Sequence, residues 1–458
     1  RGYSNSEYTR GVTTIRYTYG QTGIMLDRST SSNNAYYYER SLEGVSRNSL
    51  QTLVFADGIT YIGNNLMYPG SSSLKTVRIP DSVTAIGERS FYSCSALTGA
   101  VLHEGLQTLG NHAFSNCSSL TSLTIPVSMQ TIGSYAFSGC SSVAELTIPN
   151  TTVKMNNGCF ANMKGLRTVT LPVDYDYTSN PFSASSGSDS TNGVTTIHYT
   201  YGQTGVMTDR VSSNTVASYN RTLEYASRNA IQSIDFEDGI THVGNYLFYP
   251  GSASLTQITL PNSMQSIGNY AFYGCTALSG IDFNENLERL GDHAFEGCKS
   301  FPALPEFPER LTTVGASAFA DCDGLQELTI PAGVSSIGNR AFYGCDNLKT
   351  LTIPDIQLSL GSYAFGNCKN LRTVTLPVDY DFSNNPFAGS YTSEYTDGVT
   401  TVHFTVGQTG VMTDRTGSSN STLSYNRTLV YHSRNAIQSI DFEDGITHVL
   451  GVGAVLAA

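Results

Sequence analysis

The chain contains 458 residues, only 14% of them charged, and its formal net charge is −12. Its six lysines cannot form a basic surface that follows nucleic-acid phosphates, and an anionic membrane is an equally poor partner. No run of about 18 apolar residues occurs, so no membrane-spanning helix is predicted. The chain starts at Arg1 without a leader-like segment, and we expect a mature protein or an excised fragment.

In chain order, the sequence alternates between runs of regular repeats and irregular segments, called interludes here. The interludes are rich in Tyr, Ser, Asn and Gly, and they interrupt the repeat period. An apolar tail that departs from the repeat pattern ends the chain, and we expect an altered or truncated end there. The predicted segments are an interlude at 1–49, repeats at 50–172, an interlude at 173–230, repeats at 231–377, an interlude at 378–436, a third run beginning at 437–449, and the tail at 450–458.

A period near 23 residues governs the regular runs. Cys94, Cys117 and Cys140 are separated by 23 residues each, and five later cysteines from Cys275 to Cys368 follow at 23 or 24 residues. Such a period is typical of a solenoid, whose coils bury their inner faces only by stacking on their neighbours. A longer period lies above it, because near-identical phrases begin at Gly11, Gly193 and Gly398, with offsets of 182 and 205 residues.

Within one unit, "LTSLTIP" (120–126) alternates apolar and hydroxyl residues and predicts a short strand that ends at a proline. Gly133 supplies a turn. Ala136 and Phe137 are expected on a short helical or irregular segment, with Phe137 between layers and Cys140 as a small buried residue. In the interludes, "TTIHYTY" alternates well enough to be a strand, which could continue the solenoid or project as a hairpin.

The unit "LTSLTIPVSMQTIGSYAFSGC" resembles the BspA-like leucine-rich repeat of bacterial surface proteins, with LTIP, IG, AF and Cys at fixed offsets. The resemblance covers residues 50–173 and 231–378 and restarts at Ile437, whereas the interludes fall outside it and 300–315 departs from it. It implies an α/β repeat solenoid, right-handed and curved, with short parallel strands on the concave face and irregular or short helical segments opposite. It also implies an extracellular, non-enzymatic protein that adheres to matrix proteins, other cells or glycans.

Three candidate chemistries have ordinary explanations. One cysteine per coil predicts buried free thiols in preference to disulfides, and no C-x-x-C supports a zinc site. His112 and His293 share one repeat position, which favours surface or rim histidines over catalytic ones. Carboxylates two residues apart could begin a calcium loop, but the EF-hand continuation is missing and turn chemistry is favoured; these pairs are Asp174 with Asp176, Asp379 with Asp381, and Asp321 with Asp323. No cofactor, metal or catalytic site is predicted.

Candidate contact residues come from two places. Outward strand positions form files of hydroxyl side chains, which could bind a ligand array or even ice but also suit a solvated strand; they are Ser122, Thr124, Thr147, Thr170, Thr329, Thr352 and Thr375. Interlude tyrosines could form recognition surfaces, or could instead cap the repeat runs; they are Tyr17, Tyr19, Tyr199 and Tyr201, whose third-copy equivalents are Phe404 and Val406.

These patterns predict a non-enzymatic protein of the cell surface that binds proteins or glycans of a host or of neighbouring cells. The alternative is a structural stalk or filament built by self-association of repeated modules. Neither nucleic-acid binding nor membrane insertion is expected.

Overall fold

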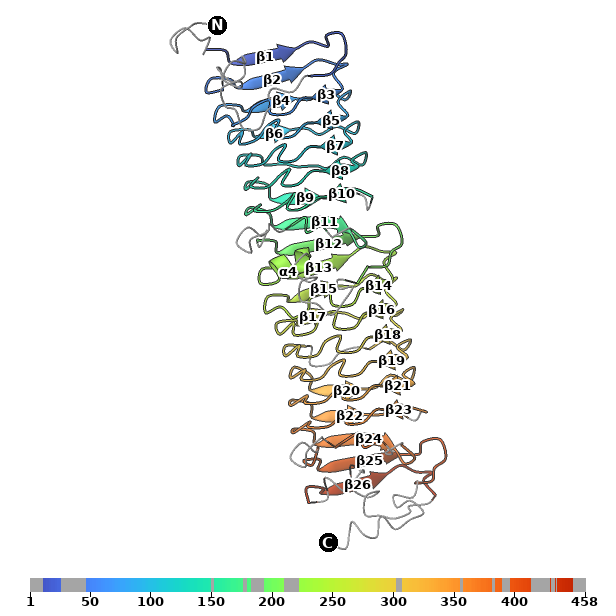
Figure 1. Cartoon of the computed structure of the whole chain (residues 1–458). Coiled ribbons are helices and arrows are strands. Elements are labelled where there is room, and N and C mark those ends of the chain that lie inside the picture. Colours follow the sequence, from blue (N-terminus) through green and yellow to red (C-terminus); the bar gives the residue numbers. More distant parts are fainter. Residues whose placement is uncertain are drawn as a thin grey trace. The chain divides into compact units, whose positions relative to one another are not determined.

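The computed structural model of the chain describes residues 11–25, 47–149, 152–175, 179–182, 193–209, 222–301, 307–354, 357–380, 384–388, 396–412, 429, 433 and 435–447. The tail at 450–458 lies outside them, as do Asp176 and Asp381. The chain divides into two compact units: unit 1 contains residues 1–204 and 213–231, and unit 2 contains 205–212 and 232–458. Each unit is a stack of coils (Figure 1).

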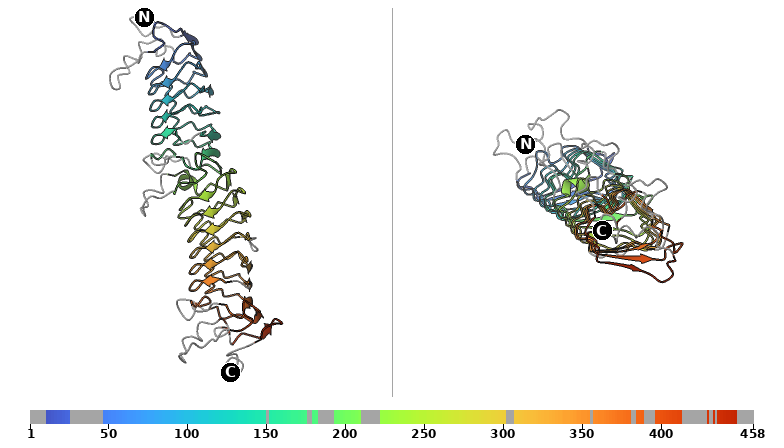
Figure 2. Two further views of the ribbon diagram at one scale, coloured as in Figure 1. Left: turned by 90° about the vertical axis from the view of Figure 1, so that its right-hand side faces the viewer. Right: turned by 90° about the horizontal axis from the view of Figure 1, so that it is seen from below.

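Unit 1 carries two ladders of parallel strands, formed by a first strand of two to five residues and a second strand of two residues from successive parts of each coil (Figure 2). The strands of the first ladder are called the longer strands, since most of them have three residues or more. Longer strands β1 to β6 pair in the order β1-β2-β4-β6, and β11 lies between β9 and β12. The short strands pair in the order β10-β8-β7-β5-β3. The longer strands are β1 (Thr14–Tyr17), β2 (Thr52–Phe55), β4 (Thr76–Arg78), β6 (Gly99–Ala100), β9 (Glu145–Thr147), β11 (Thr168–Pro172) and β12 (Thr196–Thr200); the short ones are β3 (Tyr61–Ile62), β5 (Ala85–Ile86), β7 (Thr108–Leu109), β8 (Thr131–Ile132) and β10 (Lys154–Met155).

Unit 2 repeats this arrangement. Its short strands pair in the order β14-β16-β18-β19-β21-β23, and its longer strands pair as β13-β15-β17 and β20-β22-β24-β25-β26. The longer strands are β13 (Ser233–Phe236), β15 (Gln257–Thr259), β17 (Gly280–Ile281), β20 (Glu327–Thr329), β22 (Thr350–Thr352), β24 (Thr373–Pro377), β25 (Thr401–Thr405) and β26 (Ser439–Phe442); the short ones are β14 (His242–Val243), β16 (Ser266–Ile267), β18 (Arg289–Leu290), β19 (Thr313–Val314), β21 (Ser336–Ile337) and β23 (Ser359–Leu360).

The core is a column of stacked side chains, as the repeat period predicts. In unit 1 the rings of Phe91, Phe114, Phe137 and Phe160 stack with centroid separations of 5.0, 5.6 and 5.9 Å. All nine cysteines are free and buried, which confirms the thiol ladder. Six of these thiols donate to a phenylalanine carbonyl of the preceding coil, as Cys140 does to Phe114 at 3.3 Å.

The parallel solenoid is confirmed, but the predicted helical side is not. Among the described residues α-helix occurs only at α4 (Leu223–Ser227) and at Leu429, both in interludes. Opposite the longer strands the chain forms the second ladder and then a tight turn, whose Phe137 N–H donates to the Cys159 carbonyl at 2.8 Å. Two residues of this turn adopt positive φ in most coils, such as His112 (56°) and Asn116 (61°), and a right-handed helix cannot contain them. The handedness and curvature of the solenoid stay predictions.

The middle interlude continues the solenoid instead of projecting from it. Its strand β12 pairs in parallel with β11 from Thr168 opposite Thr196 to Pro172 opposite Thr200. The buried side chains beneath it include a charged one, since Glu224 of α4 is 0% exposed. The Tyr199 hydroxyl donates to its carboxylate, and the Tyr175 hydroxyl lies 3.3 Å from Oε2 of the same group.

Candidate binding surfaces

The hydroxyl files predicted on the longer strands lie on the outer face of each unit. Thr124 bridges Thr147, Thr147 pairs with Thr170, and in unit 2 Thr329, Thr352 and Thr375 occupy successive strands in register. Ser122, Thr124, Thr147 and Thr329 are exposed, whereas Thr170, Thr352 and Thr375 are half-buried. The files therefore exist as neighbouring side chains, although nothing in their geometry selects a ligand over water.

The predicted interlude tyrosines divide into two kinds. Tyr199 is 1% exposed and belongs to the core, and Tyr17 stacks on Phe55 with centroids 5.2 Å apart. These two rings therefore pack the coil, as the capping alternative proposed. Tyr19 and Tyr201 instead keep 50% and 42% of their surface exposed.

A third surface follows the turn of each coil, where sequence analysis singled out only His112 and His293. The position before the cysteine has positive φ and carries mostly Gly, Asn or Ser, which suit that conformation; the φ values of its non-glycine members are Ser93 51°, Asn116 61°, Asn162 58°, Asp321 56° and Asn367 59°. In the regular runs, the position two residues before the phenylalanine position of each coil has the same positive φ but carries mostly bulky side chains, at Arg89 52°, His112 56°, Tyr135 56°, Tyr246 62°, Tyr270 55°, His293 57°, Arg340 57° and Tyr363 62°; its small members are Asn65 56°, Gly158 61° and Ser317 51°.

In unit 2 these bulky side chains gather into a cluster that we call the turn ridge: Tyr246, Tyr249, Tyr270, Tyr273 and His293. Tyr246 stacks on Tyr270 at 5.1 Å, and Tyr270 stacks on His293 at 4.4 Å. Tyr249 contacts Tyr273 at 5.3 Å with tilted rings. All five side chains are half-buried, so each keeps part of its surface toward solvent.

The ridge of unit 2 has an acidic border. Burial raises the pKa of Tyr270 and Tyr273, and the nearby Glu296 carboxylate raises both further. Partial desolvation also raises the pKa of Asp321, with Glu296 the leading charge contribution. In unit 1 the corresponding stack of His112 on Tyr135, at 5.2 Å, lies beside Arg89, which together with burial lowers the pKa of His112. The two units therefore present related aromatic rows in different charge surroundings.

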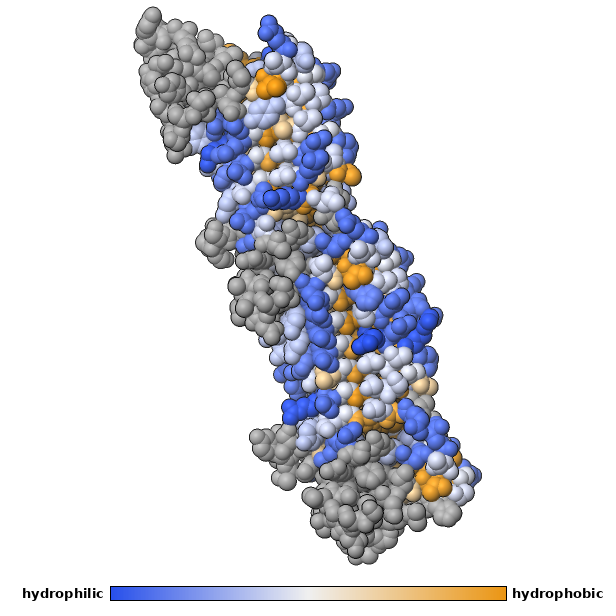
Figure 3. Space-filling model, turned by 45° about the vertical axis from the view of Figure 1, so that its right-hand side comes forward, coloured by the Kyte–Doolittle hydropathy of each residue, from blue (hydrophilic) through white to orange (hydrophobic). Residues whose placement is uncertain are grey.

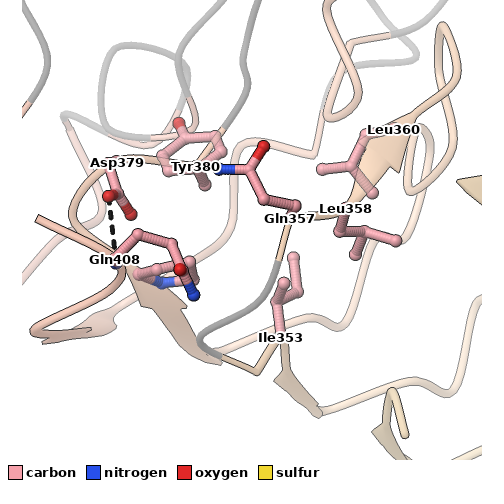
Figure 4. Close-up of a pocket in the computed structure, with 8 residues that line it drawn as sticks. Ile353, Gln357, Leu358, Leu360, Asp379, Tyr380 and Gln408 are labelled. Carbon is pink, nitrogen blue, oxygen red and sulfur yellow. Dashed lines mark hydrogen bonds between the residues drawn. The ribbon is translucent and has the colours of Figure 1, made fainter. Parts of the chain in front are cut away.

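A small pocket lies where the second repeat run meets its interlude (Figure 4). It holds about 60 Å³ and is lined by Ile353, Gln357, Leu358, Leu360, Pro377, Asp379, Tyr380 and Gln408. The Asp379 carboxylate already accepts hydrogen bonds from the chain, because its Oδ2 accepts from the backbone N–H groups of Gln408 at 3.0 Å and Thr409 at 3.1 Å. Asp174 does the same for Gln203 at 3.1 Å. These carboxylates thus stabilise turns of the main chain, and the pocket has room for a few water molecules.

Among the residues that the structure describes, there is neither a group of metal ligands nor a helix that could cross a membrane. No three His, Cys, Asp or Glu side chains among those residues are placed to hold a metal ion. Within the same ranges no helix has the length and apolar character to cross a bilayer. On the face shown in Figure 3, apolar residues form narrow stripes between hydrophilic ones. Outer surfaces, and not an enclosed site, therefore carry the candidate contacts.

Stacked coils of about 23 residues, a column of buried Phe and Cys, and parallel strands with alternating burial define a leucine-rich repeat protein. The chain belongs to the BspA type leucine rich repeat family, whose model matches residues 60–188, 214–305 and 303–402 in 6 copies.

Several solved structures are similar to this chain at low sequence identity. A leucine-rich repeat protein from Bacteroides ovatus is 23% identical over 73% of this chain and 81% of its own, with a TM-score of 0.41. A leucine rich cell surface protein from Faecalibacterium prausnitzii is 21% identical over 80% and 88%, with a TM-score of 0.31. The pneumococcal vaccine antigen PcpA is 17% identical over 95% and 92%, with a TM-score of 0.34. No curated protein matches the chain.

Proposed function

We propose that this protein is a non-enzymatic adhesion or ligand-binding protein of the cell surface, and that the turn ridge of unit 2 is one of its contact surfaces. The extracellular location rests on the resemblance to BspA-like repeats. The partners we expect are proteins or glycans of a host or of neighbouring cells.

One observation supports the proposal. Each turn has two positions with the same positive-φ backbone conformation, but the two positions carry different types of residue. Beside the cysteines the positive φ is met mostly with Gly and Asn, whereas two residues before the phenylalanine position of the regular coils it is met mostly with Tyr, His and Arg, the exceptions there being Asn65, Gly158 and Ser317. A bulky residue in this region costs about 1 kcal/mol or more relative to glycine. Ring stacking between coils, worth about 0.5–1.5 kcal/mol per pair, offsets part of this conformational cost. The half-exposed rings that result have the size and low flexibility favoured at recognition surfaces.

The test removes the rings without disturbing the turn. Asparagine tolerates this conformation and occupies the other positive-φ position at Asn116 and Asn367. We therefore combine Tyr246→Asn, Tyr270→Asn and His293→Asn. The matched control is Gly297→Asn, where an added Cβ would meet nothing nearer than 3.7 Å.

Both variants and the parent chain are screened against immobilised matrix proteins, mucins and surface polysaccharides. Saturable binding that is lost in the triple variant and kept in Gly297→Asn supports the proposal. If the triple variant still binds, the turn ridge is not a contact surface. If the parent chain binds nothing in the panel, the adhesion function itself is contradicted.

A further inference from the structure

Tyr19 packs closely on two glycines that come from different loops. A Cβ added to Gly58 would lie 2.8 Å from Cε2 of Tyr19, and one added to Gly23 would also meet Cε2 at 2.8 Å. Both glycines have positive φ, 89° and 66°. Only glycine combines this backbone with so close an approach, so the Cδ2–Cε2 edge of the ring lies against the main chain. Half of the side chain remains exposed.

The same loop recurs three times with one informative change. The "GQTG" phrase has nearly the same φ values at Gly20 and Gly23 (65° and 66°) as at Gly407 and Gly410 (65° and 62°). Tyr201 precedes the middle copy and is exposed. In the last copy Val406 takes the place of the tyrosine and still packs on the equivalent glycine, because a Cβ on Gly445 would lie 3.3 Å from its Cγ2.

The described side chains of the Tyr19 loop are uncharged, and Gln21 and Thr22 are polar, although Ile24 is also exposed. Gln21 and Thr22 are exposed, and the Thr22 hydroxyl accepts the N–H of Ile24 at 3.3 Å. Asp57 is exposed beside Gly58, and the whole chain is acidic. A polyanion is therefore disfavoured. An open aromatic face bordered by amide and hydroxyl groups suits a pyranose ring, whose C–H face stacks on the aromatic ring while its hydroxyls meet the polar border.

We propose that Tyr19 and Tyr201 are stacking platforms for neutral pyranose units of a glycan. This inference deepens the proposed binding function and rests on it, but it uses residues outside the turn ridge. Two platforms on one chain raise the avidity for a repetitive glycan without any new contact. The valine copy lacks the ring and supplies a natural comparison.

The test measures binding to an array of neutral oligosaccharides, with heparin as the anionic control. Tyr19→Ala combined with Tyr201→Ala is expected to weaken binding about tenfold or more, while the paired phenylalanine variants keep it, since the ring and not the hydroxyl stacks. Val406→Tyr is expected to strengthen binding, and two copies of the loop already accommodate tyrosine. Gln130→Ala, an exposed change elsewhere, serves as the control.

Loss in the alanine variants together with retention in the phenylalanine variants supports the platforms. Absence of neutral-oligosaccharide binding, equal binding of the alanine variants, or preference for heparin overturns them. Because the ridge variants are assayed separately, a negative array combined with ridge-dependent protein binding would remove the platforms and leave the proposed function intact.

Discussion

The buried pair of Tyr199 and Glu224 permits a quantitative test of how an interlude is held in the solenoid. Glu224 is fully buried and accepts hydrogen bonds from Tyr199 and Tyr175. The aligned positions change together along the chain, from tyrosine with glutamate at Tyr17 and Glu43 to Phe404 with Val430 in the last copy. We therefore expect Tyr199→Phe and Glu224→Val to compensate one another.

The magnitudes follow from burial. Tyr199→Phe removes a donor from a buried carboxylate, and a hydrogen bond to a charged group is worth about 1.5–3 kcal/mol. Glu224→Val leaves buried tyrosine hydroxyls without that acceptor, which costs about 1–3 kcal/mol for each group left unsatisfied. The double variant reproduces a pair that the chain already uses, and exchange of a buried polar pair for apolar residues is often nearly neutral. The Tyr175 hydroxyl still loses its acceptor in the double variant, so we expect a loss of about 1–3 kcal/mol there, less than for Glu224→Val alone, and a coupling energy of about 2 kcal/mol.

The assay is urea unfolding of the four proteins, combined with amide hydrogen exchange at β12 and α4, which reports local opening of this coil. Both single variants should raise exchange at Ile197 and Tyr199, and the double variant should restore protection. Additive losses, with the double variant worse than either single one, would refute the reasoning, because the two side chains would then act independently.

Three further outcomes are expected. Gly133→Ala should destabilise unit 1 by about 1–3 kcal/mol in urea unfolding, since its Cβ would lie 2.5 Å from the Gly110 carbonyl carbon; an unchanged midpoint would show that the coils can separate freely. The thiols should resist Ellman's reagent until the protein unfolds, because burial raises the pKa of Cys94 and Cys140 to about 12, and labelling of the native protein would contradict the ladder. Asp321→Asn should raise the melting temperature at pH 7 because the raised pKa of this carboxyl means that its charge destabilises the fold. That gain should fade as pH falls through the raised pKa and vanish below the ordinary value of 3.8; a gain that persists at low pH would assign it to the backbone alone.

The column of Phe137 and Cys140 could be predicted from the sequence because core positions repeat with the coil and admit few residue types. The turn could not. Tyr246 and Tyr270 are poor candidates for positive φ on local preference, and a short helical segment was the natural expectation. Inter-coil hydrogen bonds and ring stacking override that preference, and neither is visible within one repeat.

For the candidate contact residues too, the sequence of one repeat does not predict which side chains are buried. Tyr199 and Tyr201 are two residues apart, so a continuous strand would point both toward one side. The structure buries the first and exposes the second because β12 ends at Thr200 and Gly202 turns with φ of 69°. The burial of Tyr199 also depends on Glu224, which is 25 residues away in the sequence. Recurrence between the modules therefore draws attention to both tyrosines but cannot separate core from surface.

Comparison of the internal copies helps to distinguish core from surface positions within this one chain. A position that packing requires stays constant between copies, as Phe137 and Phe342 do in the column of rings. A position that can change from tyrosine to valine between copies, as Tyr19, Tyr201 and Val406 do, is not required for closing the coil. Tyr19 and Val406 each pack on the equivalent glycine of their own copy, Gly58 and Gly445, so the ring of Tyr19 mainly adds exposed surface. Variation from tyrosine to valine at an exposed position with nearly constant backbone therefore supports the proposal that the interlude tyrosines act as platforms, whereas the regular coils supply the scaffold.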